Sequence, residues 1–286
     1  MDLVMKKTAA FISAILLLAA CEKSVHIPIP YDGDKIVVNS LMQPDSVLYI
    51  RVTRSQPPGA TSFPAIRDAG VTVKAGDLEV PLQWQEIGGK GYFVSTQPVS
   101  AALRYTIQVA ADGLDTVRAA DTLPRRPVLA DPFAQVQGNR VKFTLKDVRG
   151  KDFYRFRLYA GEMNAAGRIV PVKRLRYRFD PSYNNSFTDL ITNNYLESTL
   201  IPDERFDGHN IAVVMQTERV SQPGDFLVLE VTGLTWHSWQ YLKTLELQNA
   251  NEGNLLVEQN RVHTNVAGGY GIFGGVNAAH LNIEIK

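Results

Sequence analysis

The sequence has a single cysteine, Cys21, among its 286 residues. One cysteine cannot form a disulfide within the chain, which excludes the class of small exported domains that disulfides hold together. An excess of charge of one sign is also missing, because the formal net charge is only +1. That balance leaves no basic excess that would point to nucleic acid, so no nucleic-acid partner is predicted and any charged partner must be recognised locally.

Motifs of common enzymes and metal sites are missing as well. The sequence contains no G-x-S-x-G, and no two of its five histidines lie within one helical turn of each other. The segment 203–208 resembles part of a calcium loop, but Arg205 stands where an oxygen ligand belongs, so a polar loop is predicted. We therefore predict no enzyme activity, no catalytic residues, no metal and no cofactor, although a triad that assembles only in space has no sequence signature.

The opening segment carries a targeting signal. Two lysines precede an apolar run from Ala9 to Leu18, which is well short of the ~20 residues that span a bilayer. The stretch Leu18-Ala19-Ala20-Cys21 then resembles the lipobox of bacterial lipoproteins. We expect residues 1–20 to be a signal peptide and Cys21 to carry acyl chains that anchor the protein. The alternative is an ordinary signal peptide followed by a buried free thiol.

A period of two dominates the rest of the chain. Residues 21–34 include two prolines and a glycine and predict an extended tether. Apolar and polar residues then alternate in short segments separated by glycine- and proline-rich turns. The predicted fold class is mainly β, with two immunoglobulin- or fibronectin III-like antiparallel β-sandwich domains. They are expected over 35–121 and 129–286, joined by a proline-rich linker over 122–128.

Two segments of the second domain depart from strand periodicity. Residues 180–208 are polar and aperiodic, and predict a long functional or mobile loop. Residues 235–249 predict a helix that Thr235 caps and that packs Trp239 and Leu242 onto a sheet. An exposed aromatic platform for sugars is the alternative for this helix. Alternation resumes at 280–286, which predicts a last short strand.

Arginines form the first candidate binding site. Arg174, Arg176 and Arg178 alternate with apolar residues, so one strand would project three guanidiniums from one face about 7 Å apart. Such a row suits the carboxylates or phosphates of an acidic glycan, a lipid or a partner loop. The alternative is a solvated face that guards the strand against edge pairing.

The second candidate is the stretch AGGYGIFGG at 267–275, which contains the spacing G-x-G-x-x-G. A dinucleotide site needs a strand before these glycines and a helix after them, whereas a β-like segment follows here. We therefore predict a turn whose glycines permit positive φ and close backbone approach. The residues of this candidate functional loop are Gly268, Gly269, Tyr270, Gly271, Phe273 and Gly274.

Several features together resemble an uncharacterised family of Bacteroidota outer-membrane lipoproteins defined by a domain of unknown function, DUF4249. These features are the lipobox, the tether, IRDAGVTV at 66–73, YRFRLY at 154–159, the aromatic helix and NVAGGYGIFGG at 265–275. The resemblance implies an outer-membrane lipoprotein, often encoded beside a TonB-dependent receptor, that acts as an accessory binding subunit. It assigns no catalytic residues. A stand-alone adhesin or glycan-binding lipoprotein and an exported hydrolase are the alternatives, and the ligand, the oligomeric state and the membrane face stay open.

Overall fold

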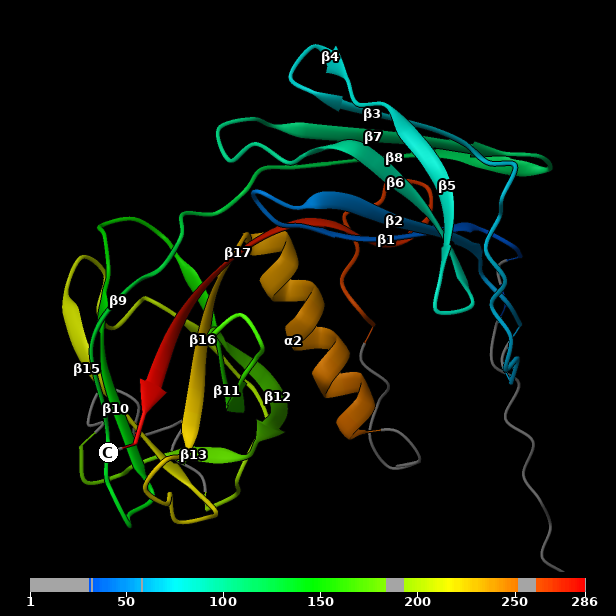
Figure 1. Cartoon of the computed structure of the whole chain (residues 1–286). Helices are drawn as coiled ribbons and strands as arrows, with labels where there is room; N and C mark the ends of the chain where they lie inside the picture. The colour runs from blue at the N-terminus through cyan, green and yellow to red at the C-terminus, as the bar shows by residue number, and fades with distance from the viewer. Residues whose placement is uncertain (1–30, 32, 58, 184–192, 252–260, 286) are drawn as a thin grey trace, which may run out of the picture. The chain divides into compact units, whose positions relative to one another are not determined.

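Segments with alternating apolar and polar residues form strands in the computed structural model, which describes residues 31, 33–57, 59–183, 193–251 and 261–285 (Figure 1). Strands account for 55% of the described residues and helix for 6%, which confirms the mainly β class. Residues Gly33–Lys286 form one compact unit. The predicted signal peptide, Cys21 and most of the predicted tether lie outside the described residues.

Two sheets enclose the first hydrophobic core. Inward-facing side chains such as Ile36, Val38 and Val52 are completely buried, while their neighbours along each strand are less so. This alternation is what a strand with one face toward a core requires. The strands of the larger sheet here are β1 (Ile36–Met42), β2 (Val47–Arg54), β5 (Leu82–Ile87) and β6 (Lys90–Pro98), and those of the facing sheet are β3 (Gly70–Ala75), β4 (Leu78–Glu79), β7 (Tyr105–Ala111) and β8 (Leu114–Asp121).

A further sheet and the other part of the larger sheet enclose a second core in the C-terminal part. Phe143 and Met215 from one sheet and Phe156 from the other are completely buried in it. The segment predicted as a loop over 180–208 contributes a short strand, β14, and its residues 184–192 lie outside the described part. The smaller sheet holds β9 (Val128–Ala134), β10 (Arg140–Lys146), β13 (Tyr177–Phe179) and β15 (Asn210–Thr217), and the larger holds β11 (Phe153–Met163), β12 (Ile169–Leu175), β14 (Thr199–Pro202) and β16 (Phe226–Leu234).

One strand takes part in both sandwiches (Figure 1). The first residues of β17 (Tyr270–Glu284) pair with β1, and the later ones pair with β16. The larger sheet therefore runs through both sandwiches in the order β12-β11-β16-β17-β1-β2-β6-β5. The β1 pairing is parallel, unlike the antiparallel pairing predicted throughout, because the antiparallel pairing with β16 sets the direction in which β17 reaches β1. The likeness to immunoglobulin and fibronectin III domains stays a prediction.

The glycine-rich beginning of β17 is a strand that the sequence pattern does not predict. The sequence predicts a turn followed by a short last strand, whereas the strand already begins at Tyr270. Gly271 has a φ of +96°, and a Cβ at this position would overlap the carbonyl oxygen of Val38. A Cβ at Gly275 would overlap the carbonyl oxygen of Thr122. The predicted close backbone approach and positive φ are therefore present, in the turn at Gly268 and Gly269 and also in the strand that follows it.

The predicted helix is present as α2 (Trp236–Ala250), with bounds one residue later than expected. Thr235 is its N-cap, and the Thr235 hydroxyl accepts a hydrogen bond from the first turn. Trp239 stacks on Phe153 of β11 at a centroid distance of 4.7 Å, and Leu242 packs beside it. The expected packing of these two residues onto the sheet is confirmed. No helix of the described residues is long and apolar enough to cross a membrane.

Buried polar groups form a seam between the two sandwiches. The carboxylate of Asp121, at the end of β8, accepts hydrogen bonds from the Thr235 hydroxyl at 2.5 Å and the Gly275 amide at 3.1 Å. The side chain of Asn265 donates to the Phe273 carbonyl at 2.8 Å and accepts from the Phe273 amide at 3.0 Å. These bonds join the end of the first sandwich to the helix cap and to β17.

Candidate functional site

The three arginines predicted to form one row do not lie on one strand. Arg174 belongs to β12 and Arg178 to β13, which are members of different sheets, and Arg176 lies between the two strands. The regular spacing of a single strand therefore does not apply to them. Their side chains have partners within the protein: Glu197 for Arg174 at 3.5 Å, Glu218 for Arg176 at 3.1 Å, and Gln216 for Arg178 at 2.9 Å.

Arg176 nevertheless lines a hollow beside the C-terminal sandwich. The hollow has a volume of about 920 Å³ and lies between the end of the β11–β12 hairpin and residues 217–226. Lys173 and Arg219 add positive charge to its lining, with acidic side chains among them and apolar side chains from β12 and β16 beneath. Arg176 is 52% exposed, and ion pairs at such exposure contribute little to stability. Its guanidinium can therefore exchange Glu218 for an acidic group of a ligand or partner.

The second candidate from the sequence lies mostly inside the protein. Gly268 and Gly269 precede β17, and Tyr270, Gly271, Phe273 and Gly274 belong to it. Phe273 is completely buried in the first core. Tyr270 is half-buried, and the ammonium of Lys35 lies 5.2 Å from its ring centre. The segment from Tyr270 to Gly274 thus packs the two sandwiches together and offers little open surface.

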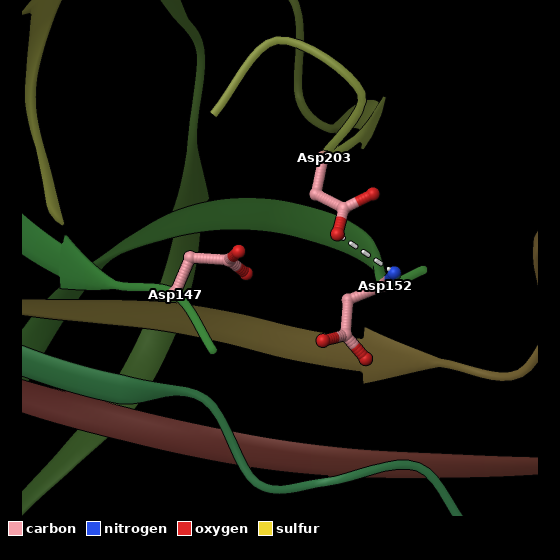
Figure 2. Close-up of side chains that lie close together, drawn as sticks. All are labelled: Asp147, Asp152 and Asp203. Carbon is pink, nitrogen blue, oxygen red and sulfur yellow. Dashed lines mark hydrogen bonds between the residues drawn. The ribbon is translucent and has the colours of Figure 1, made fainter. Parts of the chain in front are cut away.

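Three aspartates from distant parts of the sequence come together in the C-terminal sandwich (Figure 2). Asp147 follows β10, Asp152 precedes β11 and Asp203 follows β14. One carboxylate oxygen of each lies within 4.8 Å of the other two. The amide of Asp152 donates a hydrogen bond to the Asp203 carboxylate at 2.9 Å, which Figure 2 marks. We call these three residues the aspartate cluster.

Protein groups already compensate much of the charge of the aspartate cluster. The two oxygens of Asp147 accept hydrogen bonds from the Tyr154 hydroxyl at 2.5 Å and the Gly208 amide at 2.7 Å. A guanidinium nitrogen of Arg125 lies 3.0 Å from Asp152. Carboxylate oxygens are ligands that Ca²⁺ prefers, so these are the described residues that could share a metal. Their hydrogen bonds also give them a structural task, which is to fix two turns against each other.

Burial and mutual repulsion raise the pKa of two aspartates in the cluster. Burial raises the pKa of Asp152, Arg125 counteracts this, and the negative charge of Asp147 adds to the rise. Burial also raises the pKa of Asp203, and the neighbouring carboxylates add to it. Each aspartate lies in a polar turn that is unremarkable by itself. Sequence analysis missed the cluster because only the fold brings the turns together.

Glu230 is the centre of a second charged group, on the face of β11 and β16 that points away from the core. Its carboxylate accepts hydrogen bonds from Arg157 and from the Thr232 hydroxyl, the latter at 2.8 Å, and it lies 3.5 Å from His280. Burial would raise the pKa of Glu230, but the hydrogen bonds from His280 and Arg157 outweigh it and lower the pKa to about 2. Burial, with repulsion from Arg157, lowers the pKa of Arg155 to about 10.

Two of the five histidines also meet, although they are distant in the sequence. His237 Nδ1 lies 3.1 Å from His263 Nε2, and the two rings stack with their centroids 5.4 Å apart. Trp236, which is 45% exposed, contacts both rings edge-on. Burial and the neighbouring His237 lower the pKa of His263. Two imidazoles are fewer ligands than a zinc site uses, so the pair is a packing contact.

A family model described as "Domain of unknown function (DUF4249)" matches residues 22–281 of the chain. The match covers both sandwiches, the helix and almost all of β17. No curated protein matches the sequence.

Proposed function

The chain belongs to the DUF4249 family, and we propose that it is a lipid-anchored outer-membrane protein, without enzyme activity, that serves as an accessory binding subunit of a transport complex. The proposed partner is a TonB-dependent receptor. One observation carries the proposal: Cys21, the single cysteine, directly follows Leu18-Ala19-Ala20 at the end of an apolar run.

Lipid attachment explains why this position is a cysteine. A thiol is nucleophilic enough to take a diacylglyceryl group as a thioether, and cleavage before Cys21 then frees an amine for a further acyl chain. Each buried methylene contributes ~0.8 kcal/mol, and two or more chains make membrane attachment stable. The anchor confines the protein to the plane of its partner, which raises the effective concentration so that a weak interface is occupied.

The hollow that contains Arg176 supports a binding role. Its mixed charges suit a polar segment of a partner, because each sign can find a counterpart there. Its volume of about 920 Å³ also lies within the range of ligand sites. We therefore propose the hollow as the partner-binding surface.

Affinity purification from native outer membranes, with a tag at the C-terminus, tests this function. We expect a large β-barrel receptor to co-purify with the protein. The Cys21→Ala variant should move to the soluble fraction and lose the receptor. Mass spectrometry of the mature amino terminus checks the anchor directly, and an amino terminus without fatty acid would overturn the proposal.

A charge reversal tests the proposed surface. Arg176→Glu places an acidic side chain beside Glu218 in the lining of the hollow. We expect this variant to reduce the recovery of the receptor about tenfold. Arg54→Glu is the matched control, because Arg54 is 42% exposed and also pairs with one acidic residue, Asp34 at 3.1 Å. Equal losses in both variants would exclude the hollow as the interface. An anchored protein without any co-purifying barrel would favour an adhesin that acts alone.

A further inference from the structure

A slot on the outer face of the smaller C-terminal sheet has the composition of a ligand site. It has a volume of about 730 Å³ and is separate from both the hollow and the aspartate cluster. Its smaller side chains are Thr144 of β10 and two residues of β15, and larger ones come from β9, β10 and the segment after β13. The residues of this slot that matter here are Phe133, Gln135, Lys142, Thr144, Tyr183 and Ala212.

The slot has two exposed aromatic rings. Phe133 is 57% exposed and Tyr183 is 61% exposed, although exposing a large ring to water is unfavourable. The Arg140 guanidinium lies 5.7 Å from the centre of the Tyr183 ring, and Asp180 holds Arg140 through a hydrogen bond of 2.6 Å. Tyr183 is therefore positioned by its neighbours before any ligand arrives.

A β-bulge turns Phe133 outward. Leu129 pairs with Leu145, but beyond the bulge Phe133 pairs with Lys142. Without the extra residue Phe133 would pair with Val141, whose side chain is completely buried in the core. Asp131 in the bulge has a φ of +51°, a conformation that costs a non-glycine residue on the order of 1 kcal/mol. A strained backbone thus serves to place an apolar ring in water, which structural packing does not require.

We propose that the slot binds a neutral saccharide. One face of a sugar ring presents C–H groups, which stack on aromatic rings, while its rim presents hydroxyls, which need hydrogen-bond partners. The slot supplies the amide of Gln135, the ammonium of Lys142 and the hydroxyl of Thr144 beside its rings. Asp180 compensates Arg140, and Asp131 carries the opposite charge to Lys142, so the lining favours a ligand without net charge.

The test uses the full-length protein with its anchor, purified in detergent, on a printed array of neutral and acidic oligosaccharides. We expect neutral oligosaccharides to bind, and the strongest of them is then titrated by calorimetry. Phe133→Ala and Tyr183→Ala should each weaken its binding at least tenfold. Tyr183→Phe, which keeps the ring, should retain binding within about threefold.

Tyr49→Ala is the control, because Tyr49 is 45% exposed on the other sandwich and should leave binding unchanged. Circular dichroism during heating verifies that every variant is folded. Absence of binding to all neutral oligosaccharides, binding restricted to acidic ones, or equal binding by the Phe133→Ala variant would each overturn the proposal. Receptor co-purification should be unaffected by Phe133→Ala, so the saccharide site and the accessory function can fail separately.

Discussion

Glu230 and the aspartate cluster are two ways of burying negative charge in the same sandwich. Glu230 is surrounded by Arg157, His280 and a threonine hydroxyl, and its pKa falls to about 2. The aspartates lie mainly beside one another, and the pKa of Asp152 and that of Asp203 rise. Burial opposes ionisation at both sites, so the neighbouring groups determine the sign of the shift. A buried carboxylate therefore stabilises the fold where cations surround it, as at Glu230, and repels its neighbours where they are carboxylates, as in the aspartate cluster.

Removing the charge of Glu230 should have the largest effect. Glu230→Gln removes the carboxylate that pairs with Arg157 and Arg155, two mostly buried guanidiniums, and we expect the free energy of unfolding to fall by about 3 kcal/mol at neutral pH. Urea denaturation monitored by circular dichroism measures the change. Glu284→Gln is the control, since Glu284 is an exposed residue at the end of β17. A loss below 1 kcal/mol would show that the Glu230 group adds nothing to stability.

Acid should reproduce much of that loss in the unchanged protein. The folded-state pKa of Glu230, about 2, lies below its ordinary value of 4.5, so its contribution is complete above pH 4.5 and disappears as the pH falls toward 2. The shift corresponds to about 3 kcal/mol. Asp152 and Asp203 act in the opposite direction, because their raised pKa values make protonation favour the folded state.

Denaturation in urea at pH 6 and pH 3 distinguishes the contribution of Glu230 from that of the other acidic groups. The unchanged protein should lose more stability between these values than Glu230→Gln does, because the variant has already lost the titrating carboxylate. Identical losses would mean that other acidic groups dominate the acid response.

The hydroxyl of Tyr154 gives a smaller test of the aspartate cluster. Tyr154→Phe removes the 2.5 Å hydrogen bond to Asp147, a buried carboxylate, and we expect a loss of about 2 kcal/mol. Tyr177→Phe is the comparison, because the Tyr177 hydroxyl donates at 2.8 Å to a neutral acceptor, the Phe156 carbonyl, and its loss should cost about 1 kcal/mol. Equal costs in thermal or urea unfolding would mean that the Asp147 charge does not strengthen the bond.

Local periodicity was sufficient to predict the fold class and the helix, but not the contacts between segments. Alternation of apolar and polar residues predicted the mainly β class, and helical spacing placed Trp239 and Leu242 on the sheet. The beginning of β17 escaped prediction because Gly271 is required by the close approach of β1, which lies at the other end of the chain.

The arrangement of the candidate site residues differs from the prediction for the same reason. Alternation around Arg176 predicted one strand, whereas pairing with different sheets divides it there. The slot depends on a single extra residue in β9, which period-two analysis cannot detect because the segment contains a proline and its apolar residues do not alternate. Side chains that owe their position to partners far along the chain have no local signature, and the aspartate cluster consists entirely of such residues.

Reducing the repulsion in the cluster should give the smallest effect, and one of opposite sign. In Asp203→Asn the remaining carbonyl oxygen still accepts from the Asp152 amide, while one of the clustered negative charges is gone. We expect the free energy of unfolding at pH 7 to rise by about 0.5 kcal/mol in the presence of EDTA, and the gain to shrink as acid protonates the native carboxylate. Repeating the unfolding measurement in the presence of calcium tests whether a cation, in addition to Arg125, Tyr154 and Gly208, balances the negative charge of the aspartate cluster. A calcium-dependent rise in the melting temperature of the unchanged protein that Asp203→Asn abolishes would show that the cluster is completed by a cation.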